Sequence, residues 1–539
     1  MKLLALMCVV IQSSVLVSCQ DDTVTVTSDV GNIMGRRLTR MFGNQTYSVD
    51  TFRGIPYAES THGERRFIRP SARAYFKETF DATKPSVACP QNMKMDATPQ
   101  YERTVSEDCL RLSIVTPAGA SSGGTSKAVM VFIYGGGFQV GFQEMYLSTA
   151  LPGLNDVIYV TMNYRVGIYG FLANRERGMT GNNGLWDQQM ALQWVKANIA
   201  AFGGDPSRIT VFGESAGAAS VIYQAMKEGN EGLFSRAIAE SGSVGPVWSF
   251  SKNPDADSVR FAEKVGCSGP GWIRCLQEMN LDTLQSYIDT TDVFLPIFDG
   301  DFVNYNPREL FTNDNLWLGP FKELDLIMGL NSNEGFMTIQ GELGLPIKDF
   351  TDGLTEDEFN RFTEYLWTSS NMVASPALLA SVKHVYTDWD MPDDPIARRN
   401  EFMEIFVDDF ATAIVNRLRS HVRAGGMATA YMYVFDIRPS WTQAPEWVEG
   451  ANHFDEVPYV LGFPPMWFGE GDPAATLPDR DIQIAKNIMA YWTQFAKTGY
   501  DVESIDPSNS CCITKCFCDF IILFTRILSD YNIIVRICH

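Results

Sequence analysis

The sequence predicts an α/β fold in which a large, mostly parallel β-sheet is covered by helices on both faces. From about residue 128 onward, short and almost continuously apolar segments alternate with segments of helical spacing. Strands of a parallel sheet have this unbroken apolar character because helices bury both of their faces. Apolar residues make up 45% of the 539 residues, which is enough for one large core.

The first 19 residues are typical of a secretory signal peptide. Lys2 supplies the positive start, residues 3–17 the apolar segment, and residues 17–19 a cleavage site of small residues. We therefore expect a secreted, extracellular protein that begins near Gln20. The alternatives are a membrane anchor, for which the apolar segment is short, and a bacterial lipoprotein signal that would make Cys19 a lipid anchor.

Residues 23–57 alternate short β-prone segments with turns, and this pattern predicts a small N-terminal sheet. The sequence Asn44-Gln45-Thr46 lies between two of these segments and matches the acceptor motif for N-linked glycosylation. We therefore expect Asn44 to be glycosylated on an exposed hairpin.

Eleven cysteines are present, but the body of the chain holds only Cys89, Cys109, Cys267 and Cys275. Four cysteines allow three different pairings. In a secreted protein the simplest solution is the two pairs that are local in sequence, Cys89–Cys109 and Cys267–Cys275. Free buried thiols are the alternative.

The formal net charge is −21 at pH 7. Nucleic-acid binding requires a basic surface, so this balance argues against a nucleic-acid partner. It favours a soluble protein whose copies repel one another.

The expected elements follow in order along the chain. Strands are predicted at residues 128–134, 156–162, 209–212, 236–239, 324–328 and 429–434. Helices are predicted at residues 186–200 and directly after residue 215. Residues 340–425 are mostly helical in pattern and are expected to cap the sheet, while residues 119–125 read as a flexible loop.

Residues 500–539 lose this pattern. Four cysteines crowd into residues 511–518, and the apolar segment 520–537 is interrupted by charged residues. The interruptions argue against a transmembrane helix, and the cysteine spacing is not that of a zinc finger, although a metal site is the alternative. We interpret these residues as an atypical tail that follows one domain of residues 20–499.

Residues 209–217 carry the strongest chemical signal. A β-prone segment runs into Gly213-Glu214-Ser215-Ala216-Gly217 and then into a helix-like segment. This order predicts a nucleophile elbow, a sharp turn that exposes the Ser215 hydroxyl at the edge of a sheet. The alternative is a tight turn after a buried strand. Residues 119–123 match the same pentapeptide around Ser121, but no strand leads into them, so we interpret them as a loop.

A serine needs a base that removes its proton, and the base needs a third group that orients it. Four of the five histidines follow Ser215. His384 and His421 lie in helical segments, and His539 lies in the atypical tail. His453 follows a turn and is the best candidate base, because catalytic residues are common on loops. The alternative is a loop histidine that hydrogen-bonds only to backbone.

The acid is expected between the serine and the base in this type of fold. Many carboxylates fit this order. Glu334 is a candidate because it follows the predicted strand 324–328 and a polar turn; an exposed loop carboxylate is the alternative. The oxyanion of acyl transfer needs backbone N–H donors. The glycines of residues 135–137 directly follow a predicted strand and let bare N–H groups approach a ligand, and the N–H of Ala216, after the nucleophile, is one more donor; a flexible loop or a phosphate-binding turn is the alternative for the glycines.

Several motifs in one order resemble the type-B carboxylesterases of the cholinesterase/carboxylesterase family. They are residues 52–58, 106–110, 135–137, 163–167, 203–206, 212–217, 333–335 and 453–456. The resemblance covers about residues 25–499 and implies the α/β-hydrolase fold. It also implies a serine esterase without a cofactor or metal, with Ser215, Glu334 and His453 as the catalytic residues.

The resemblance implies further residue roles. The N–H groups of Gly136, Gly137 and Ala216 would hold the oxyanion. Glu214, Ser241 and Glu456 would form a second polar layer near the base. Buried ion pairs would join Arg66 to Glu107 and Arg165 to Asp187, and the same two local disulfides would form. The acyl side of the site would be lined by Trp248, Leu295 and Phe336.

The sequence also departs from the cholinesterase pattern. Residues 92–105 contain no Trp, where cholinesterases carry the one that cradles choline, and have only Tyr101 as an aromatic. No cysteine lies between Cys275 and Cys511 to form the third disulfide of the family. The usual continuation after Gly499 is absent.

These features together predict a secreted serine carboxylesterase that acts on small-molecule esters through an acyl-enzyme. A cholinesterase-like enzyme is one alternative, and a lipase is a further one. A different class of function is a non-catalytic adhesion or signalling protein on the same fold. Such members usually lose the serine, the acid or the histidine, and this chain has all three. The sequence does not specify the oligomeric state.

Overall fold

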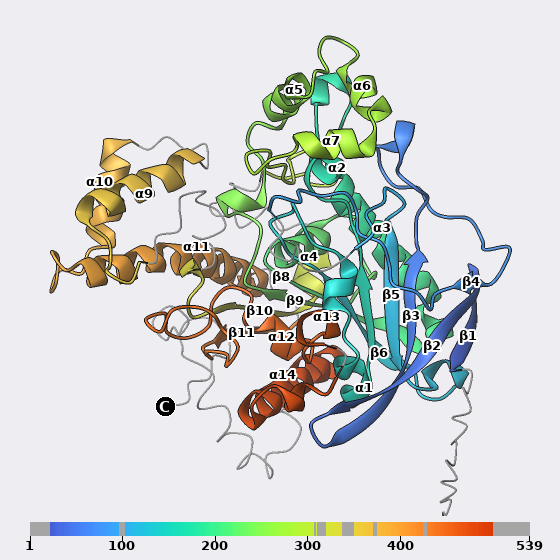
Figure 1. The fold of residues 1–539 in the computed structure, drawn as a ribbon. Coiled ribbons are helices and arrows are strands. Elements are labelled where there is room, and N and C mark those ends of the chain that lie inside the picture. The colour runs from blue at the N-terminus through green and yellow to red at the C-terminus, as the bar shows by residue number, and fades with distance from the viewer. Residues whose placement is uncertain are drawn as a thin grey trace, which may run out of the picture.

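The computed structural model describes residues 22–95, 103–306, 309, 320–336, 350–369, 375–423, 428–469 and 471–499. Their strands form one 11-stranded sheet that runs through the molecule (Figure 1). The strand order is β1-β2-β3-β5-β7-β6-β8-β9-β10-β11, with β4 paired to β2 beside this path. The expected large sheet is therefore confirmed. The predicted signal peptide, the tail of residues 500–539 and Tyr101 lie outside the described residues.

The N-terminal strands are antiparallel. They are β1 (Thr23–Ser28), β2 (Gly31–Phe42), β3 (Gln45–Pro56) and β5 (Arg111–Pro117), together with the short β4 (Phe80–Asp81). These strands do not close into a sheet of their own, because β3 pairs with β5 and β5 pairs with β7. The expected small N-terminal sheet is thus the antiparallel end of the main sheet. Asn44 is exposed in the turn between β2 and β3.

The other strands run parallel to one another. They are β6 (Lys127–Ile133), β7 (Ile158–Met162), β8 (Gly204–Glu214), β9 (Arg236–Glu240), β10 (Asp325–Asn331) and β11 (Ala430–Phe435). Each corresponds to a strand expected from the apolar pattern. Because all their neighbouring pairs are parallel, their carboxyl ends meet at one edge of the sheet, where α/β proteins build binding sites.

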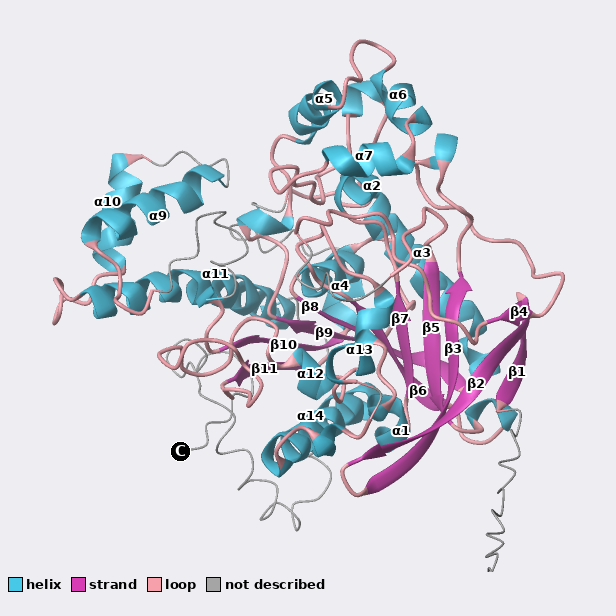
Figure 2. Ribbon diagram, viewed as in Figure 1, coloured by secondary structure: helices cyan, strands magenta, loops and turns pink. Residues whose placement is uncertain are grey.

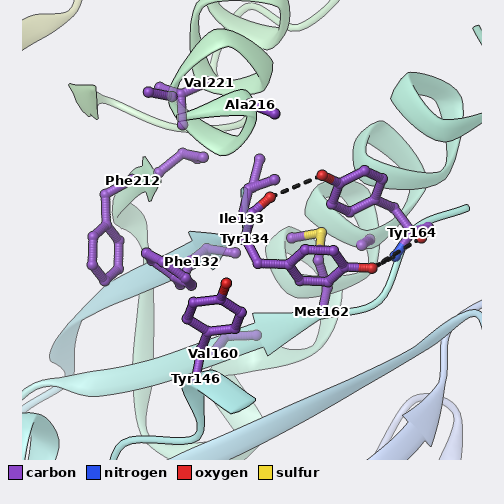
Figure 3. Close-up of a cluster of buried hydrophobic side chains, with 14 of the residues drawn as sticks. Phe132, Ile133, Tyr134, Tyr146, Val160, Met162, Tyr164, Phe212, Ala216 and Val221 are labelled. Carbon is purple, nitrogen blue, oxygen red and sulfur yellow. Dashed lines mark hydrogen bonds between the residues drawn. The ribbon is translucent and has the colours of Figure 1, made fainter. Parts of the chain in front are cut away.

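The middle of the sheet lies in the centre of the core. Phe132 of β6 and Phe212 of β8 pack with ring centroids 5.0 Å apart (Figure 3). Tyr134 and Tyr164 stack at 4.5 Å, and each hydroxyl donates a hydrogen bond to the carbonyl oxygen of the other residue, over 3.0 and 2.8 Å. These bonds satisfy two polar groups that would otherwise be costly to bury.

Helices cover both faces of the sheet (Figure 2). In chain order they are α1 (Ala150–Asn155), α2 (Gly167–Phe171), α3 (Asn183–Asn198), α4 (Ala216–Met226), α5 (Pro254–Lys264), α6 (Trp272–Glu278), α7 (Leu281–Tyr287), α9 (Glu356–Ser369), α10 (Pro376–Val385), α11 (Pro395–Arg423), α12 (Val457–Val460), α13 (Pro465–Phe468) and α14 (Asp479–Thr498). Helices α3 and α4 pack on β8, while α1 and α14 contact each other and the strands. Among the described residues, none of these helices combines the length and apolar character needed to cross a bilayer.

Helices α9 and α10 project away from the sheet instead of capping it (Figure 1). They pack on the first half of α11 around a separate apolar cluster, where Phe359 and Phe362 of α9 meet Phe402 of α11. Only the second half of α11 joins the main core, through residues that include Phe410. The expectation that residues 340–425 cap the sheet is therefore correct only for this second half.

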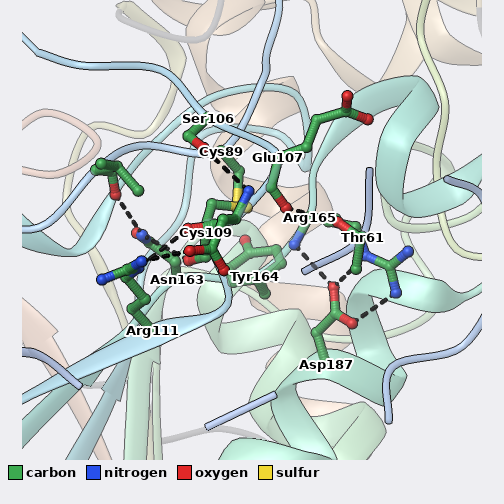
Figure 4. The surroundings of a disulfide bond; sticks show 12 residues. Thr61, Cys89, Ser106, Glu107, Cys109, Arg111, Asn163, Tyr164, Arg165 and Asp187 are labelled. Carbon is green, nitrogen blue, oxygen red and sulfur yellow. Dashed lines mark hydrogen bonds and ion pairs between the residues drawn. A yellow bond between two sulfur atoms is a disulfide. The ribbon is translucent and has the colours of Figure 1, made fainter. Parts of the chain in front are cut away.

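Both local disulfides are present, Cys89–Cys109 and Cys267–Cys275. The two expected buried ion pairs are present as well. Arg165 binds Asp187 through Nε and Nη2, each 2.7 Å from a carboxylate oxygen (Figure 4), and Arg66 binds Glu107 at 2.6 Å.

Candidate active site

Ser215 occupies a strained turn between β8 and α4. Its backbone has φ 58° and ψ −123°, a conformation that is costly for any residue with a side chain. The neighbouring glycines make the turn possible. A Cβ on Gly213 or Gly217 would collide with the carbonyl oxygen of Ile133 at the end of β6. This close packing of turn against strand is the geometry of a nucleophile elbow.

The second pentapeptide match has none of these features. Ser121 lies in a short 3-10 turn, Ala120–Ser122, outside the sheet. A Cβ on Gly119 or Gly123 would meet nothing within 4 Å. The interpretation of this segment as a loop is therefore correct.

Glu334 and His453 come together from segments 119 residues apart. Glu334 follows β10, and His453 lies in the loop between β11 and α12. His453 Nδ1 is 2.6 Å from Glu334 Oε2, and Glu334 Oε1 accepts a 2.7 Å hydrogen bond from the Asn331 N–H. The Glu334 side chain is fully buried, so both its oxygens are held in place. This carboxylate fixes the orientation of the imidazole.

The other ring nitrogen of His453 does not contact the serine. Nε2 lies 3.1 Å from Glu214 Oε1. Within the part of the chain that the structure describes, no hydrogen bond joins His453 to the hydroxyl of Ser215. Glu214 Oε1 makes no hydrogen bond among the described residues, so this approach is a close contact and not a hydrogen bond. The structure therefore brings acid and base together, and Nε2 is hydrogen-bonded to neither Glu214 nor Ser215 among the described residues.

A glycine loop follows β6 and lies against the elbow. A Cβ on Gly135 would lie 3.0 Å from Ser215 Cβ. Gly136 and Gly137 have φ of 98° and 61° and are exposed, and their N–H groups make no hydrogen bond among the described residues. Ala216 is the first residue of α4, where a backbone N–H has no acceptor within its helix. Three N–H groups are thus available beside the serine.

Buried carboxylates surround the base. Glu214, Glu240, Glu334 and Glu456 are each at most 2% exposed. Asn331 donates from its side chain to Glu456 Oε2 over 2.5 Å and to the Asn452 carbonyl over 2.6 Å. Asn331 could be recognised in the sequence only by its place in the polar turn before Glu334. Ser241 Oγ is buried beside β9 with no hydrogen-bond partner among the described residues.

Burial and mutual repulsion change the proton affinities of these groups. Burial raises the pKa of Glu456 well above its usual range, and the charge of Glu214 raises it further. Burial also raises the pKa of Glu214, while the charge of His453 opposes this. Burial by itself lowers the pKa of His453, but the charges of Glu214 and Glu334 outweigh it, so the pKa is raised.

Aromatic side chains form one wall beside the base. The Phe410 ring of α11 lies 5.3 Å from the His453 ring and 5.6 Å from the Trp248 ring. Phe336 instead packs on Trp447 at 5.6 Å, and Leu295 lies half-buried against the main core. Phe410 could not be identified from the sequence, because the helical pattern of its segment indicates an apolar face but not what that face contacts.

The other described histidines after the serine have structural surroundings. His421 is buried on α11, with Nε2 2.8 Å from the Leu324 carbonyl oxygen, and burial lowers its pKa. His384 lies beside Trp389 at the end of α10. Neither histidine contacts Ser215 or Glu334.

Comparisons with known proteins identify one family. The sequence model of the carboxylesterase family matches residues 20–512. The chain is 31% identical to Neuroligin-3 of Mus musculus over 533 residues, which cover 89% of this chain and 62% of the relative. It is 31% identical to Neuroligin-2 of Mus musculus over 527 residues, which cover 88% of this chain and 60% of the relative. Against Neuroligin-3 of Homo sapiens the identity is 30% over 553 residues, with 89% and 63% covered. The chain thus spans about three fifths of the length of these curated relatives.

Proposed function

The chain belongs to the carboxylesterase family, and from this premise we propose that it is a serine carboxylesterase that forms an acyl-enzyme on Ser215. The observation that carries the proposal is the elbow. Ser215 has a strained backbone at the carboxyl edge of a parallel sheet, beside a glycine loop with unpaired N–H groups. Strain of this kind persists only where the surrounding structure enforces it, and it is common at catalytic residues.

The reaction follows from the positions of these groups. The Ser215 hydroxyl attacks the ester carbonyl carbon as His453 Nε2 takes its proton, and Glu334 stabilises the resulting imidazolium. The N–H groups of Gly136, Gly137 and Ala216 hold the oxyanion. The imidazolium then protonates the departing alcohol, and a water molecule activated by the same histidine releases the acid. Each oxyanion donor contributes roughly 3–4 kcal/mol in well-studied cases.

Hydrolysis of p-nitrophenyl acetate tests the proposal. We expect Ser215→Ala to lower kcat by at least about 10³-fold, and the matched variant Ser121→Ala to leave it unchanged. A fluorophosphonate probe is expected to add one adduct, which peptide mass spectrometry places on Ser215. Absence of turnover and of labelling in folded wild-type protein, over the pH range 6 to 10, would refute the enzyme function.

The second candidate is a non-catalytic adhesion or signalling protein. Two observations favour it: the relatives above carry the name neuroligin rather than an enzyme name, and His453 makes no hydrogen bond to Ser215 among the described residues. The same labelling experiment separates the two functions. A protein without a catalytic role retains a folded elbow but leaves the probe unreacted.

Among esters, we propose that butyrate and aryl esters are better substrates than acetylthiocholine. The reason is that residues 92–105 contain no Trp on which a choline cation could stack. Comparison of kcat/KM for p-nitrophenyl butyrate and acetylthiocholine checks this preference. A clear preference for thiocholine would favour the cholinesterase-like alternative.

We further propose that the enzyme is secreted, with residues 20–499 as the catalytic domain and a glycan on Asn44. Two disulfides suit an oxidising compartment, and Asn44 is exposed at the tip of a hairpin. Expression in a secreting eukaryotic cell tests all three statements. We expect the intact mass to be that of a chain that begins near Gln20. Glycosidase treatment should lower this mass in wild type but not in Asn44→Gln.

A further inference from the structure

Asp409 is an exposed carboxylate on a side of α11 that is otherwise buried. Residues three, four and seven positions apart lie on the same side of a helix. On this side Phe402, Phe406 and Ala413 are at most 7% exposed. An exposed side chain that is bracketed by buried ones faces an opening in the protein instead of its outer surface. Asp409 therefore lies in such an opening.

The opening lies at the aromatic wall beside the proposed base. Phe410 follows Asp409 directly in the helix. Its ring lies 5.3 Å from the His453 ring and 5.6 Å from the Trp248 ring. The Trp248 indole favours the charged form of Asp409, so it lies near the carboxylate, although its Nε1 is buried and makes no hydrogen bond among the described residues. Asp409 thus adds a negative charge to a wall of aromatic rings.

No cation neutralises Asp409 within the part of the chain that the structure describes. Its pKa is shifted by burial and by Trp248, and by no basic side chain. Its neighbour on the helix, Asp408, instead accepts a 2.9 Å hydrogen bond from the Tyr386 hydroxyl. Burial raises the pKa of Asp409 to about 6, and Trp248 opposes this rise. At pH 8 the group is therefore a carboxylate without a counter-charge, and solvent can reach it.

We propose that Asp409 binds a cationic group of the substrate, and that the esters which fit this site carry a primary ammonium group. This inference rests on the proposed function, because Ser215 would attack the ester that Asp409 holds. A primary ammonium group donates charge-assisted hydrogen bonds to a carboxylate, which are stronger than neutral ones. A quaternary ammonium group has no N–H to donate, and residues 92–105 offer no Trp on which it could stack. The site therefore selects primary ammonium groups over choline.

The carboxylate of Asp409 lies some way from the imidazole of His453. The charges that raise the pKa of His453 are those of Glu214, Glu334 and Glu456, and Asp409 is not among them. Because the effect of a charge weakens with distance, the Asp409 carboxylate is farther from the ring than these three. The ammonium group must therefore be joined to the ester carbonyl through a flexible chain. A 6-aminohexanoyl ester has such a chain, and the heptanoyl ester is its neutral counterpart of equal length.

Kinetics with these two p-nitrophenyl esters at pH 8 test the site. The measured quantity is the ratio of kcat/KM for the 6-aminohexanoate to kcat/KM for the heptanoate, which cancels any general loss of activity. We expect Asp409→Asn to lower this ratio about tenfold or more, and Asp409→Glu to lower it less. Asp408→Asn is the matched control, because it removes the same charge from the adjacent residue, and it should leave the ratio unchanged. Equal falls for the two Asn variants, or no fall in Asp409→Asn, would overturn the site.

Calorimetry with hexylammonium tests the site without relying on turnover. We expect this cation to bind wild-type protein and to bind Asp409→Asn about tenfold more weakly. Hexyltrimethylammonium should bind wild type more weakly than hexylammonium does, and tighter binding of the quaternary ion would overturn the proposal. If hexylammonium binds as expected but no ester is hydrolysed, the cation site stands and the proposed function fails. If esters are hydrolysed but Asp409→Asn binds hexylammonium as tightly as wild type does, the enzyme function stands and the cation site is wrong.

Discussion

Trp492 of α14 donates its indole N–H to Glu240 Oε1 of β9 over 2.6 Å, and both residues lie in the core. This is a single hydrogen bond to a fully buried carboxyl group. Burial raises the pKa of Glu240 to about 8, and the bond from Trp492 only partly offsets it. Since the carboxyl group binds its proton more tightly in the folded state, stability due to Glu240 falls as the pH rises from about 4.5 to about 8.

Glu240→Gln should remove this loss, because an amide does not ionise and its oxygen can still accept the indole hydrogen. We expect the variant to gain stability relative to wild type as the pH rises through this range. One pKa unit corresponds to about 1.4 kcal/mol, so the gain is on the order of a few kcal/mol. Urea unfolding at pH 5 and pH 8.5 measures it, with the exposed Glu263→Gln as control. Parallel profiles for variant and wild type would contradict the prediction.

Gly217→Ala should destroy the elbow. Its new Cβ would collide with the Ile133 carbonyl oxygen, which is backbone of a central strand and cannot move aside. We expect a loss of about 1–3 kcal/mol or more in the free energy of unfolding, together with loss of fluorophosphonate labelling. Gly271→Ala is the control, since a Cβ there meets nothing within 4 Å and its φ is negative. A fully labelled Gly217→Ala protein would show that the turn tolerates a side chain.

The buried pair of Arg165 and Asp187 should matter far more than an exposed pair. Asp187 accepts hydrogen bonds from the backbone N–H, Nε and Nη2 of Arg165, and both side chains are at most 2% exposed. Asp187→Asn leaves a buried guanidinium without its counter-charge, which costs about 3–5 kcal/mol. The comparison is Glu278→Gln, which breaks the exposed pair with Arg274 and should not change the unfolding midpoint measurably.

Phe410 should support the base through ring packing. Phe410→Leu removes the ring that lies 5.3 Å from the His453 ring, so the imidazole gains freedom, and we expect kcat to fall on the order of tenfold. Phe406→Leu, one turn earlier on α11 but within the separate cluster, should leave kcat unchanged. Stopped-flow hydrolysis and thermal unfolding of both variants distinguish this effect from a general loss of stability. Equal kcat values for the two variants would exclude a role for Phe410.

Much of the fold could be predicted because its strands carry local signals. The apolar segments of β6, β8 and β10 predict these strands without any knowledge of the rest of the fold. The strand, turn and helix around Ser215 are contiguous in sequence. Glu334 and His453 could be selected as loop residues after strands. The features that could not be predicted depend on packing between segments that are distant in sequence. No local pattern shows that Glu214 Oε1 reaches His453.

The same reason explains the two errors in the architecture. The sequences of the N-terminal strands do not show whether these strands form a separate sheet or join the main one. They join it because β3 pairs with β5. The helical pattern of residues 356–385 marks apolar faces but not their partner. Those faces bury Phe359 and Phe362 against the first half of α11 instead of against the sheet.

The proposed nucleophile, acid and base follow three different strands, β8, β10 and β11, which lie at one end of the strand order with only β9 among them. A nascent chain that ends before β11 already contains the serine but has no histidine to activate it. With the proposed mechanism, hydrolysis therefore requires that the chain has folded as far as β11. After denaturation, we expect hydrolysis to recover only when this last strand has joined the sheet, and not when the central core alone has formed.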